Sequence, residues 1–143
     1  MNQLTLESLF SNVFELYFKA HGMHWNVEGI NFPTYHAFFG ELYQEVYSSI
    51  DDLAEEIRVT GLYVPYGCAA VSNNLSYSTR QIYSTNIRDM LNDLSMSNKI
   101  VIEAYKKAFA ECNDEGFKDF LAGRLDAHKK IQWKLNSCIK GLE

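Results

Sequence analysis

The chain has 143 residues, a formal net charge of −5 and a pI of about 5.3. Hydrophobic residues make up 47% and aromatic residues 14%, which argues against disorder and predicts one globular domain over 1–143. Nonspecific binding to nucleic acid depends on Lys and Arg that neutralise phosphates. The acidic balance therefore makes DNA a poor partner and suits metal cations better.

The sequence also bears on compartment. Its start, MNQLTLESLF, has neither the basic beginning nor the apolar core of a signal peptide, and no run of about 18 apolar residues could span a membrane. Cys68, Cys112 and Cys138 form no CxxC pair and no zinc pattern, which predicts free thiols in a reducing compartment. A cytoplasmic protein with no membrane association is expected.

Long stretches carry apolar residues at three- and four-residue steps, the spacing of buried helix faces. Pro33 is placed for a first helical turn, Gly61 for a helix end, and Ser84 or Thr85 for a helix cap. The predicted helices span 4–24, 33–60, 85–112 and 115–140.

The connection between the second and third helices, 61–84, is too long for a structureless loop and predicts a short helix around 71–82. A connection of this length can cross the bundle instead of turning straight back. We therefore predict an all-α, ferritin-like four-helix bundle with a long crossover between helices two and three.

Four residues could hold a metal ion: His24, His36, Asp51 and Glu55. Asp51 and Glu55 are four apart and share a helix face. His36 and Asp51 are fifteen positions apart, which is roughly 22 Å along a continuous helix. Because metal–ligand bonds are only about 2 Å long, one chain cannot bring both to one ion. Two antiparallel copies about a two-fold axis can, which predicts sites shared between subunits.

Other interpretations remain open at this point. No glutamate is followed three residues later by a histidine, so a di-iron site inside one bundle is not expected. His24 could instead be a satisfied histidine at a helix end, His36 an interface residue, and the two acids part of a solvated face. Trp25 fits core or interface packing, or an electron donor near a metal.

The same stretch resembles the Dps family, the ferritin-like DNA-binding proteins from starved cells. The pattern is His24-Trp25-Asn26-Val27, Gly29, Phe32, His36, Leu42-Tyr43, Asp51, Ala54-Glu55 and Gly61, with Trp133 late in the last helix. The resemblance implies a ferroxidase, with Fe(II) oxidised between subunits of a hollow dodecamer and stored as ferric mineral. It implies hydrogen peroxide as preferred oxidant, with oxygen as the alternative.

The resemblance also assigns ligands. It implies that His24 and His36 of one subunit bind iron together with Asp51 and Glu55 of its two-fold partner. Zinc or another divalent ion is an alternative occupant. The chain departs from the family at Gly40, where an acid usually stands, which predicts one firmly bound metal per site and slower or altered oxidation.

Two further expectations concern the surface. The family's Lys-rich tail is missing, since no basic residue precedes Lys19 and KLNSCIKGLE holds two lysines, so DNA binding is expected to be weak or absent. The acids Asp114, Glu115, Asp119 and Asp126 fit a solvated helix start better than a three-fold pore for iron. The alternative function is a structural or DNA-associated shell with a degenerate metal site.

Overall fold

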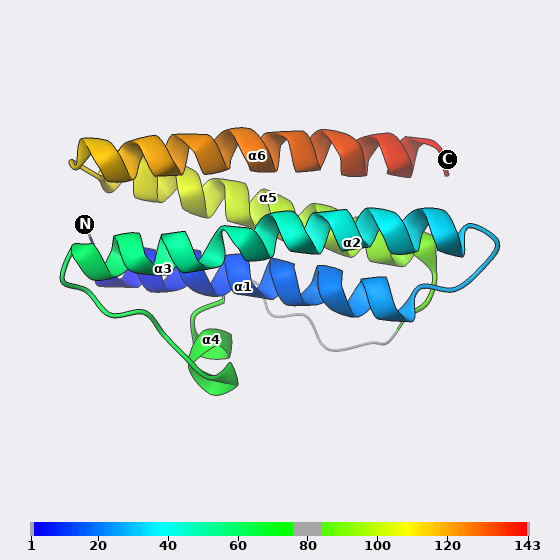
Figure 1. The fold of residues 1–143 in the computed structure, drawn as a ribbon, viewed down its shortest axis with the longest axis horizontal. Coiled ribbons are helices and arrows are strands. Elements are labelled where there is room, and N and C mark those ends of the chain that lie inside the picture. Colours follow the sequence, from blue (N-terminus) through cyan, green and yellow to red (C-terminus); the bar gives the residue numbers. More distant parts are fainter. Residues whose placement is uncertain (1, 76–83, 143) are drawn as a thin grey trace.

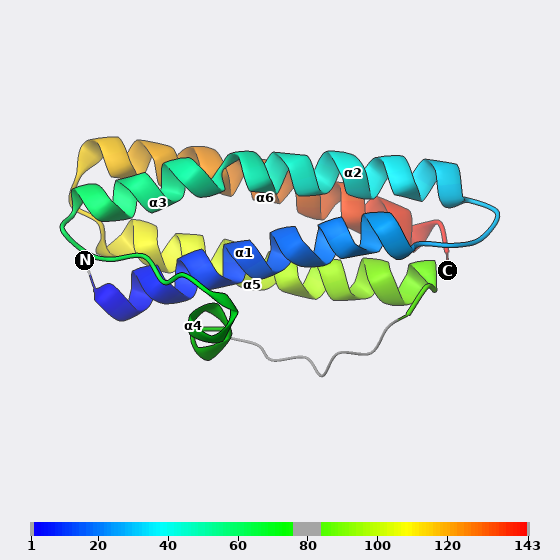
Figure 2. The same cartoon turned by 60° about the horizontal axis from the view of Figure 1, so that its bottom comes forward.

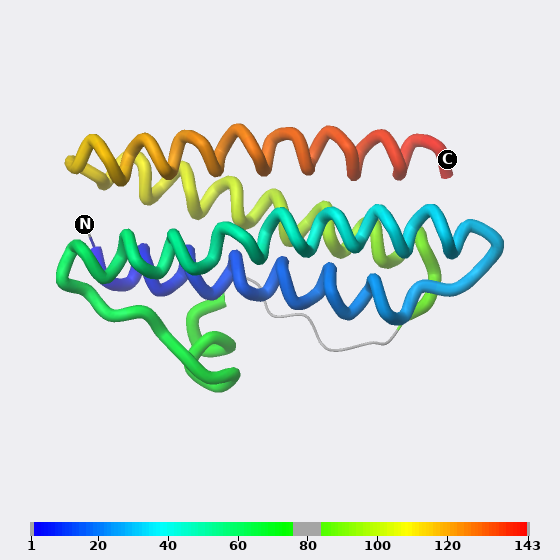
Figure 3. The backbone as a smooth tube through the Cα atoms, viewed as in Figure 1, coloured from blue at the N-terminus to red at the C-terminus, as the bar shows by residue number. Residues whose placement is uncertain are grey.

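The computed structural model describes residues 2–75 and 84–142. Within them the chain forms six helices and no strand: α1 (Gln3–Asn26), α2 (Phe32–Ser48), α3 (Ile50–Val59), α4 (Cys68–Asn73), α5 (Ile87–Glu111) and α6 (Glu115–Lys140). α2 and α3 follow each other end to end, so they act as one rod beside α1, α5 and α6 (Figures 1 and 3). The predicted all-α ferritin-like bundle is confirmed.

The bundle consists of two antiparallel pairs. α1 packs against α2, α5 packs against α6, and α1 also packs against α5. α3 ends at the opposite end of the bundle from the start of α5 (Figure 2). This places α5 parallel to α2 and α3, as the predicted crossover requires.

The predicted continuous helix over 33–60 is interrupted at Ser49. The buried Ser49 hydroxyl donates a hydrogen bond to the Val46 carbonyl at 2.6 Å, and the Ser49 N–H donates to the same carbonyl at 3.1 Å. A serine that bonds back into the preceding turn tightens and bends a helix. Since the Leu53 N–H still donates to the Ser49 carbonyl at 3.0 Å, α3 continues in nearly the same direction (Figure 3).

Two other predicted boundaries move. Asn86 caps α5, because its side-chain oxygen accepts from the N–H groups of Arg88 and Asp89 at 2.9 and 3.3 Å; Ser84 and Thr85 do not cap it. The short helix of the crossover lies at Cys68–Asn73, earlier than predicted, with its buried Val71 facing the bundle. The remainder of the predicted 71–82 helix falls largely on 76–83, outside the described residues.

The core is a continuous apolar cluster along the bundle axis. Its fully buried members include Leu6, Leu16, Phe39, Val46, Leu53, Leu91, Val101, Phe117, Leu121 and Leu135. At about 25 cal/mol per Å² of buried apolar surface, this burial is the main stabilising term. None of the described helices has the length and hydropathy of a membrane span.

Candidate metal site

A tight turn brings two histidines together at one end of the bundle. His24 lies in the last turns of α1 and His36 near the start of α2, and Gly29 makes the turn between them with a φ of +121°, which favours glycine. The two imidazole rings stack with centroids 3.9 Å apart and planes at 15°. The predicted histidine pair is therefore formed within one subunit.

Each histidine is held by the backbone of the other. His24 Nδ1 lies 2.6 Å from the His36 carbonyl oxygen, and His36 Nδ1 lies 2.7 Å from the His24 carbonyl oxygen. A carbonyl only accepts, so both Nδ1 atoms carry the hydrogen. In the neutral ring, Nε2 then keeps its lone pair. A hydrogen bond from Nδ1 to a carbonyl thus fixes the tautomer whose Nε2 can bind a metal. No other described residue bonds to either Nε2.

Gly40 lies directly behind His24. A Cβ built on this buried glycine would lie 3.1 Å from both Nδ1 and Cε1 of the His24 ring. That is tighter than ordinary van der Waals contact, so any side chain here pushes the imidazole outward. The sequence indicated only that an acid is missing at this position; the structure shows that the missing side chain makes room for His24.

Aromatic rings surround the pair. Phe32 stacks on His36 with centroids 4.8 Å apart, and Tyr43 lies 5.4 Å from His24. Tyr43 also stacks on His21 at 3.8 Å, and burial, together with His24, lowers the pKa of His21. Trp25 is 58% exposed, so core packing is excluded for it, and interface packing and an electron donor both remain predictions.

The predicted carboxylates form a second, separate pair. Asp51 and Glu55 are exposed on α3, one turn apart. The negative charge of Asp51 and a hydrogen bond with it raise the pKa of Glu55. Two neighbouring carboxylates of this kind are stabilised by a cation, which removes their mutual repulsion.

The two pairs do not meet within one subunit. His36 and Asp51 lie on one rod, about 22 Å apart at the ordinary helical rise, and α2 and α3 remain end to end despite the break at Ser49 (Figure 1). Among the described residues, no three His, Cys, Asp or Glu side chains gather in a cluster that could hold a metal. The structure thus places the donors in two half-sites, the histidine pair and the carboxylate pair. That the two half-sites meet across a subunit interface is still a prediction.

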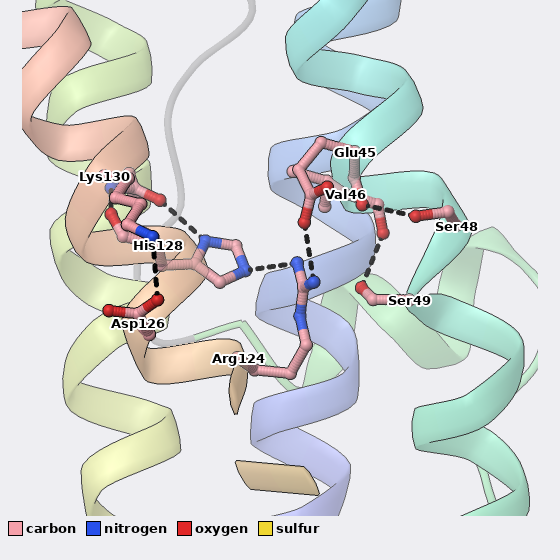
Figure 4. A network of polar contacts seen from close by, with 9 residues as sticks. Glu45, Val46, Ser48, Ser49, Arg124, Asp126, His128 and Lys130 are labelled. Atoms are coloured by element: carbon pink, nitrogen blue, oxygen red, sulfur yellow. Dashed lines mark hydrogen bonds and ion pairs between the residues drawn. The ribbon is translucent and has the colours of Figure 1, made fainter. Parts of the chain in front are cut away.

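A polar network that sequence reasoning missed fills the middle of the bundle (Figure 4). Arg124 on α6 donates to the Glu45 carboxylate on α2 at 2.7 Å and to His128 Nε2 at 3.2 Å. His128 Nδ1 donates to the Asn98 side-chain oxygen on α5 at 2.8 Å. Burial, reinforced by the Arg124 charge, lowers the pKa of His128 to about 3, so this ring is neutral.

The sequence did carry a signal for this network. His128 lies seven residues after the buried Leu121 and seven before the buried Leu135, so it falls on the apolar stripe of α6. A polar side chain on such a stripe is buried and needs partners. Tyr105, also buried here, has its pKa raised to about 12, chiefly by desolvation.

The remaining predicted positions have local roles. Asp114 caps α6 by accepting from the Phe117 N–H at 2.8 Å, and Asp126 pairs with Lys130 at 3.1 Å. The Asp114 contact fits the helix start that the sequence favoured over a pore, whereas Asp126 lies in the middle of α6. All three cysteines are free thiols: Cys68 is exposed, Cys112 buried and Cys138 half-buried.

Comparisons with known proteins agree with this architecture. Residues 3–143 match the ferritin-like domain family. The chain is 29% identical over 147 residues to DNA protection during starvation protein 2 of Bacillus anthracis, covering 97% of this chain and 99% of the relative. It is also 29% identical over 141 residues to DNA protection during starvation protein 1 of Deinococcus radiodurans, covering 94% and 67%.

Solved structures give the same fold. The Dps protein of Vibrio cholerae superposes with a TM-score of 0.88 at 24% identity, covering 96% of this chain and 87% of that one. That protein is described as a member of a broad superfamily of ferritin-like diiron-carboxylate proteins. With the family match spanning nearly the whole chain and Dps relatives aligned over its length, this chain belongs to the ferritin-like family and is a member of its Dps branch.

Proposed function

We propose that this protein is a Dps-type miniferritin that oxidises Fe(II), with hydrogen peroxide as oxidant, and stores ferric iron inside a dodecameric shell. In this proposal, each site takes His24 and His36 from one subunit and Asp51 and Glu55 from its two-fold partner. The observation that carries it is the reciprocal hydrogen bonding of the two histidines, which leaves both Nε2 lone pairs available.

The donor set suits iron as a substrate. Neutral imidazoles and carboxylates together bind Fe(II), and the two negative charges favour Fe(III) as the ion's charge grows. The neighbouring acids, whose repulsion raises the pKa of Glu55, gain most from a cation. Peroxide would be reduced to water while iron is oxidised, which removes both reagents of a damaging reaction.

Gly40 leads us to propose one firmly bound iron per site. It offers no oxygen ligand, and Glu41, the next residue, is rotated by about 100° around the helix. An aspartate at position 40 would have to displace the His24 ring that lies against this glycine. Two tightly bound irons per site in a metal titration of the assembled protein would contradict this reading.

The proposal is tested by mixing assembled protein with Fe(II) and peroxide and following ferric absorbance. His36→Ala and Asp51→Asn should each slow the reaction by about 100-fold or more, since even outer-shell changes cost 10–100-fold. Asp52→Asn is the matched control, because it removes the same charge at the neighbouring exposed position and should change little. Wild-type rates in His36→Ala would overturn the assignment.

The second candidate is a structural or DNA-associated shell whose metal site is degenerate and only weakly active, and Gly40 is the observation that favours it. A third is a shell that binds zinc or another divalent ion only for assembly. If the site serves only assembly, adding zinc should change the oligomeric state of the protein, and the protein should not speed the oxidation of Fe(II). We propose weak or absent DNA binding, because the chain carries a net charge of −5. A clear gel shift at about 150 mM salt, where screening is substantial, would contradict that.

A further inference from the structure

Three buried side-chain atoms in the bundle have no hydrogen-bond partner among the described residues: the Ser11 hydroxyl, the Tyr105 hydroxyl and Arg124 Nε. They belong to α1, α5 and α6. Buried polar groups in proteins are nearly always paired, either with other protein groups or with a bound molecule, because an unpaired group has lost its bonds to solvent and gained none. Three such atoms in one interior therefore indicate a ligand.

The Tyr105 hydroxyl lies close to the Arg124 side chain. Tyr105 is fully buried, and desolvation raises its pKa to about 12, while the nearby Arg124 charge and the Ser49 hydroxyl offset part of this rise. Neither neighbour makes a direct hydrogen bond with the Tyr105 hydroxyl. Arg124 already uses its two terminal nitrogens on Glu45 and His128, so Nε is the donor that remains (Figure 4).

The third unpaired atom lies at the same level of the bundle. α1 and α5 run antiparallel, and the Thr5 hydroxyl donates to the Glu111 carboxylate at 3.1 Å. Counted along the two helices from this contact, Ser11 is level with Tyr105. The unpaired polar groups therefore share one layer of an otherwise apolar core.

Ser49 supplies an acceptor in this layer. Its hydroxyl hydrogen is used in the bond to the Val46 carbonyl at 2.6 Å, so its oxygen can still accept. Arg124 Nε can only donate, and the Tyr105 hydroxyl can do either. One water molecule matches this set, because it can accept from Arg124 Nε and from Tyr105 and donate to Ser49. Buried waters typically make about three hydrogen bonds of this kind.

Charge excludes the other small ligands. The Arg124 guanidinium is already neutralised by the Glu45 carboxylate at 2.7 Å, so a further anion would be a buried charge without a partner. A metal cation would be repelled by the guanidinium. A neutral molecule that both donates and accepts hydrogen bonds fits the site.

We propose that one ordered water is bound here and bridges the Tyr105 hydroxyl, Arg124 Nε and the Ser49 hydroxyl. It joins α5 and α6 to the junction of α2 with α3, where the rod is interrupted. Since α2 carries His36 and α3 carries Asp51, this junction lies between the two half-sites. The inference does not depend on iron oxidation and goes beyond the proposed function.

A high-resolution crystal structure of the assembled protein tests the site directly. Density for a water within hydrogen-bond distance of Tyr105 Oη, Arg124 Nε and Ser49 Oγ is the expected result. A direct bond from the Tyr105 hydroxyl to either neighbour, with no water between them, overturns the inference. Crystals grown in bromide test for an anion, and an anomalous peak at this position also overturns it.

Tyr105→Phe tests the same claim in solution through the sign of its effect. If the water is bound, the variant removes one of its bonds, and the thermal midpoint at fixed protein concentration should fall. If the hydroxyl has no partner, its removal ends a desolvation cost and the midpoint should rise. Tyr66→Phe is the matched control, because this ring is 90% exposed in the subunit and its midpoint should match wild type. A midpoint for Tyr105→Phe at or above that of wild type overturns the inference.

Discussion

His128 in the middle of the bundle and His24 at its end each donate a hydrogen bond from Nδ1. They differ at the other ring nitrogen, Nε2. In the bundle centre, His128 Nδ1 donates to Asn98, and its Nε2 is occupied by Arg124 at 3.2 Å. At the end of the bundle, His24 Nδ1 donates to a backbone carbonyl, and no described residue binds its Nε2. The first imidazole is closed and the second is open.

This difference bears on where metal can bind. The centre of the bundle already holds a permanent cation, the Arg124 guanidinium, which is 12% exposed and paired with Glu45. A divalent ion there would be repelled by that charge and would find the Glu45 carboxylate engaged. The open histidines lie at the surface, where a second subunit can add carboxylates.

The largest expected effect is a loss of stability when the Arg124 contact that occupies His128 Nε2 is removed. Arg124→Ala leaves the buried His128 Nε2 without a partner, which should cost about 1–3 kcal/mol of stability. The loss of the Glu45 ion pair adds little, because the Glu45 side chain is 45% exposed. The measurement is the thermal midpoint at fixed protein concentration, because assembly makes the midpoint concentration-dependent. Lys130→Ala, which removes an exposed ion pair with Asp126, is the control and should cost no more than about 0.5 kcal/mol.

The closed site should also make the fold sensitive to acid. The folded-state pKa of His128 is about 3, below its ordinary value of 6.5. A depressed pKa means that the unfolded chain binds the proton, so this stabilisation is complete above pH 6.5 and is lost as pH falls. The slope is about 1 kcal/mol per pH unit below that point.

His128→Gln, which cannot titrate, should therefore lose less stability than wild type between pH 6.5 and pH 5. Denaturant unfolding at several pH values measures the difference. Parallel pH profiles for the two proteins would show that His128 is not kept neutral by the fold.

A smaller effect, on metal affinity, is expected when a side chain is added at Gly40 behind the His24 ring. Gly40→Ala places a Cβ 3.1 Å from the His24 ring and should displace it by a few tenths of an ångström. Misplaced ligands typically lower metal affinity about tenfold. Titration with Fe(II) under anaerobic conditions measures it, with Gly123→Ala as control, because nothing lies within 4 Å of a Cβ built there. Equal affinities in both variants would mean that Gly40 has no part in placing His24.

The sequence predicted the open site better than the closed one. His24 and His36 lie in the short motif on which the resemblance to the Dps family rests, and that resemblance implied that they bind one metal together. The closed site joins Glu45, Asn98 and His128 from three different helices, and only packing decides such a contact. The apolar stripe of α6 indicated that His128 is buried and gave no indication of its partners.

The ends of the helices were also predicted only approximately. Apolar periodicity predicted the rod that α2 and α3 form end to end. The break in it depends on the hydrogen bond that the Ser49 hydroxyl donates to the Val46 carbonyl, and periodicity does not predict that bond. Asn86 caps α5 in preference to Ser84, although both residue types are good caps. Tertiary packing decides between such local alternatives, and one sequence does not reveal that choice.

If the histidines of one subunit bind iron together with the carboxylates of another, two inactive variants should complement each other in a mixed shell. His36→Ala and Asp51→Asn subunits should each assemble into shells that fail to oxidise Fe(II). Co-expressed, they form mixed two-fold interfaces in which one of the two sites is fully wild type, so random mixing should restore about a quarter of wild-type activity. Mixed shells as inactive as either parent, with assembly intact, would contradict the shared site.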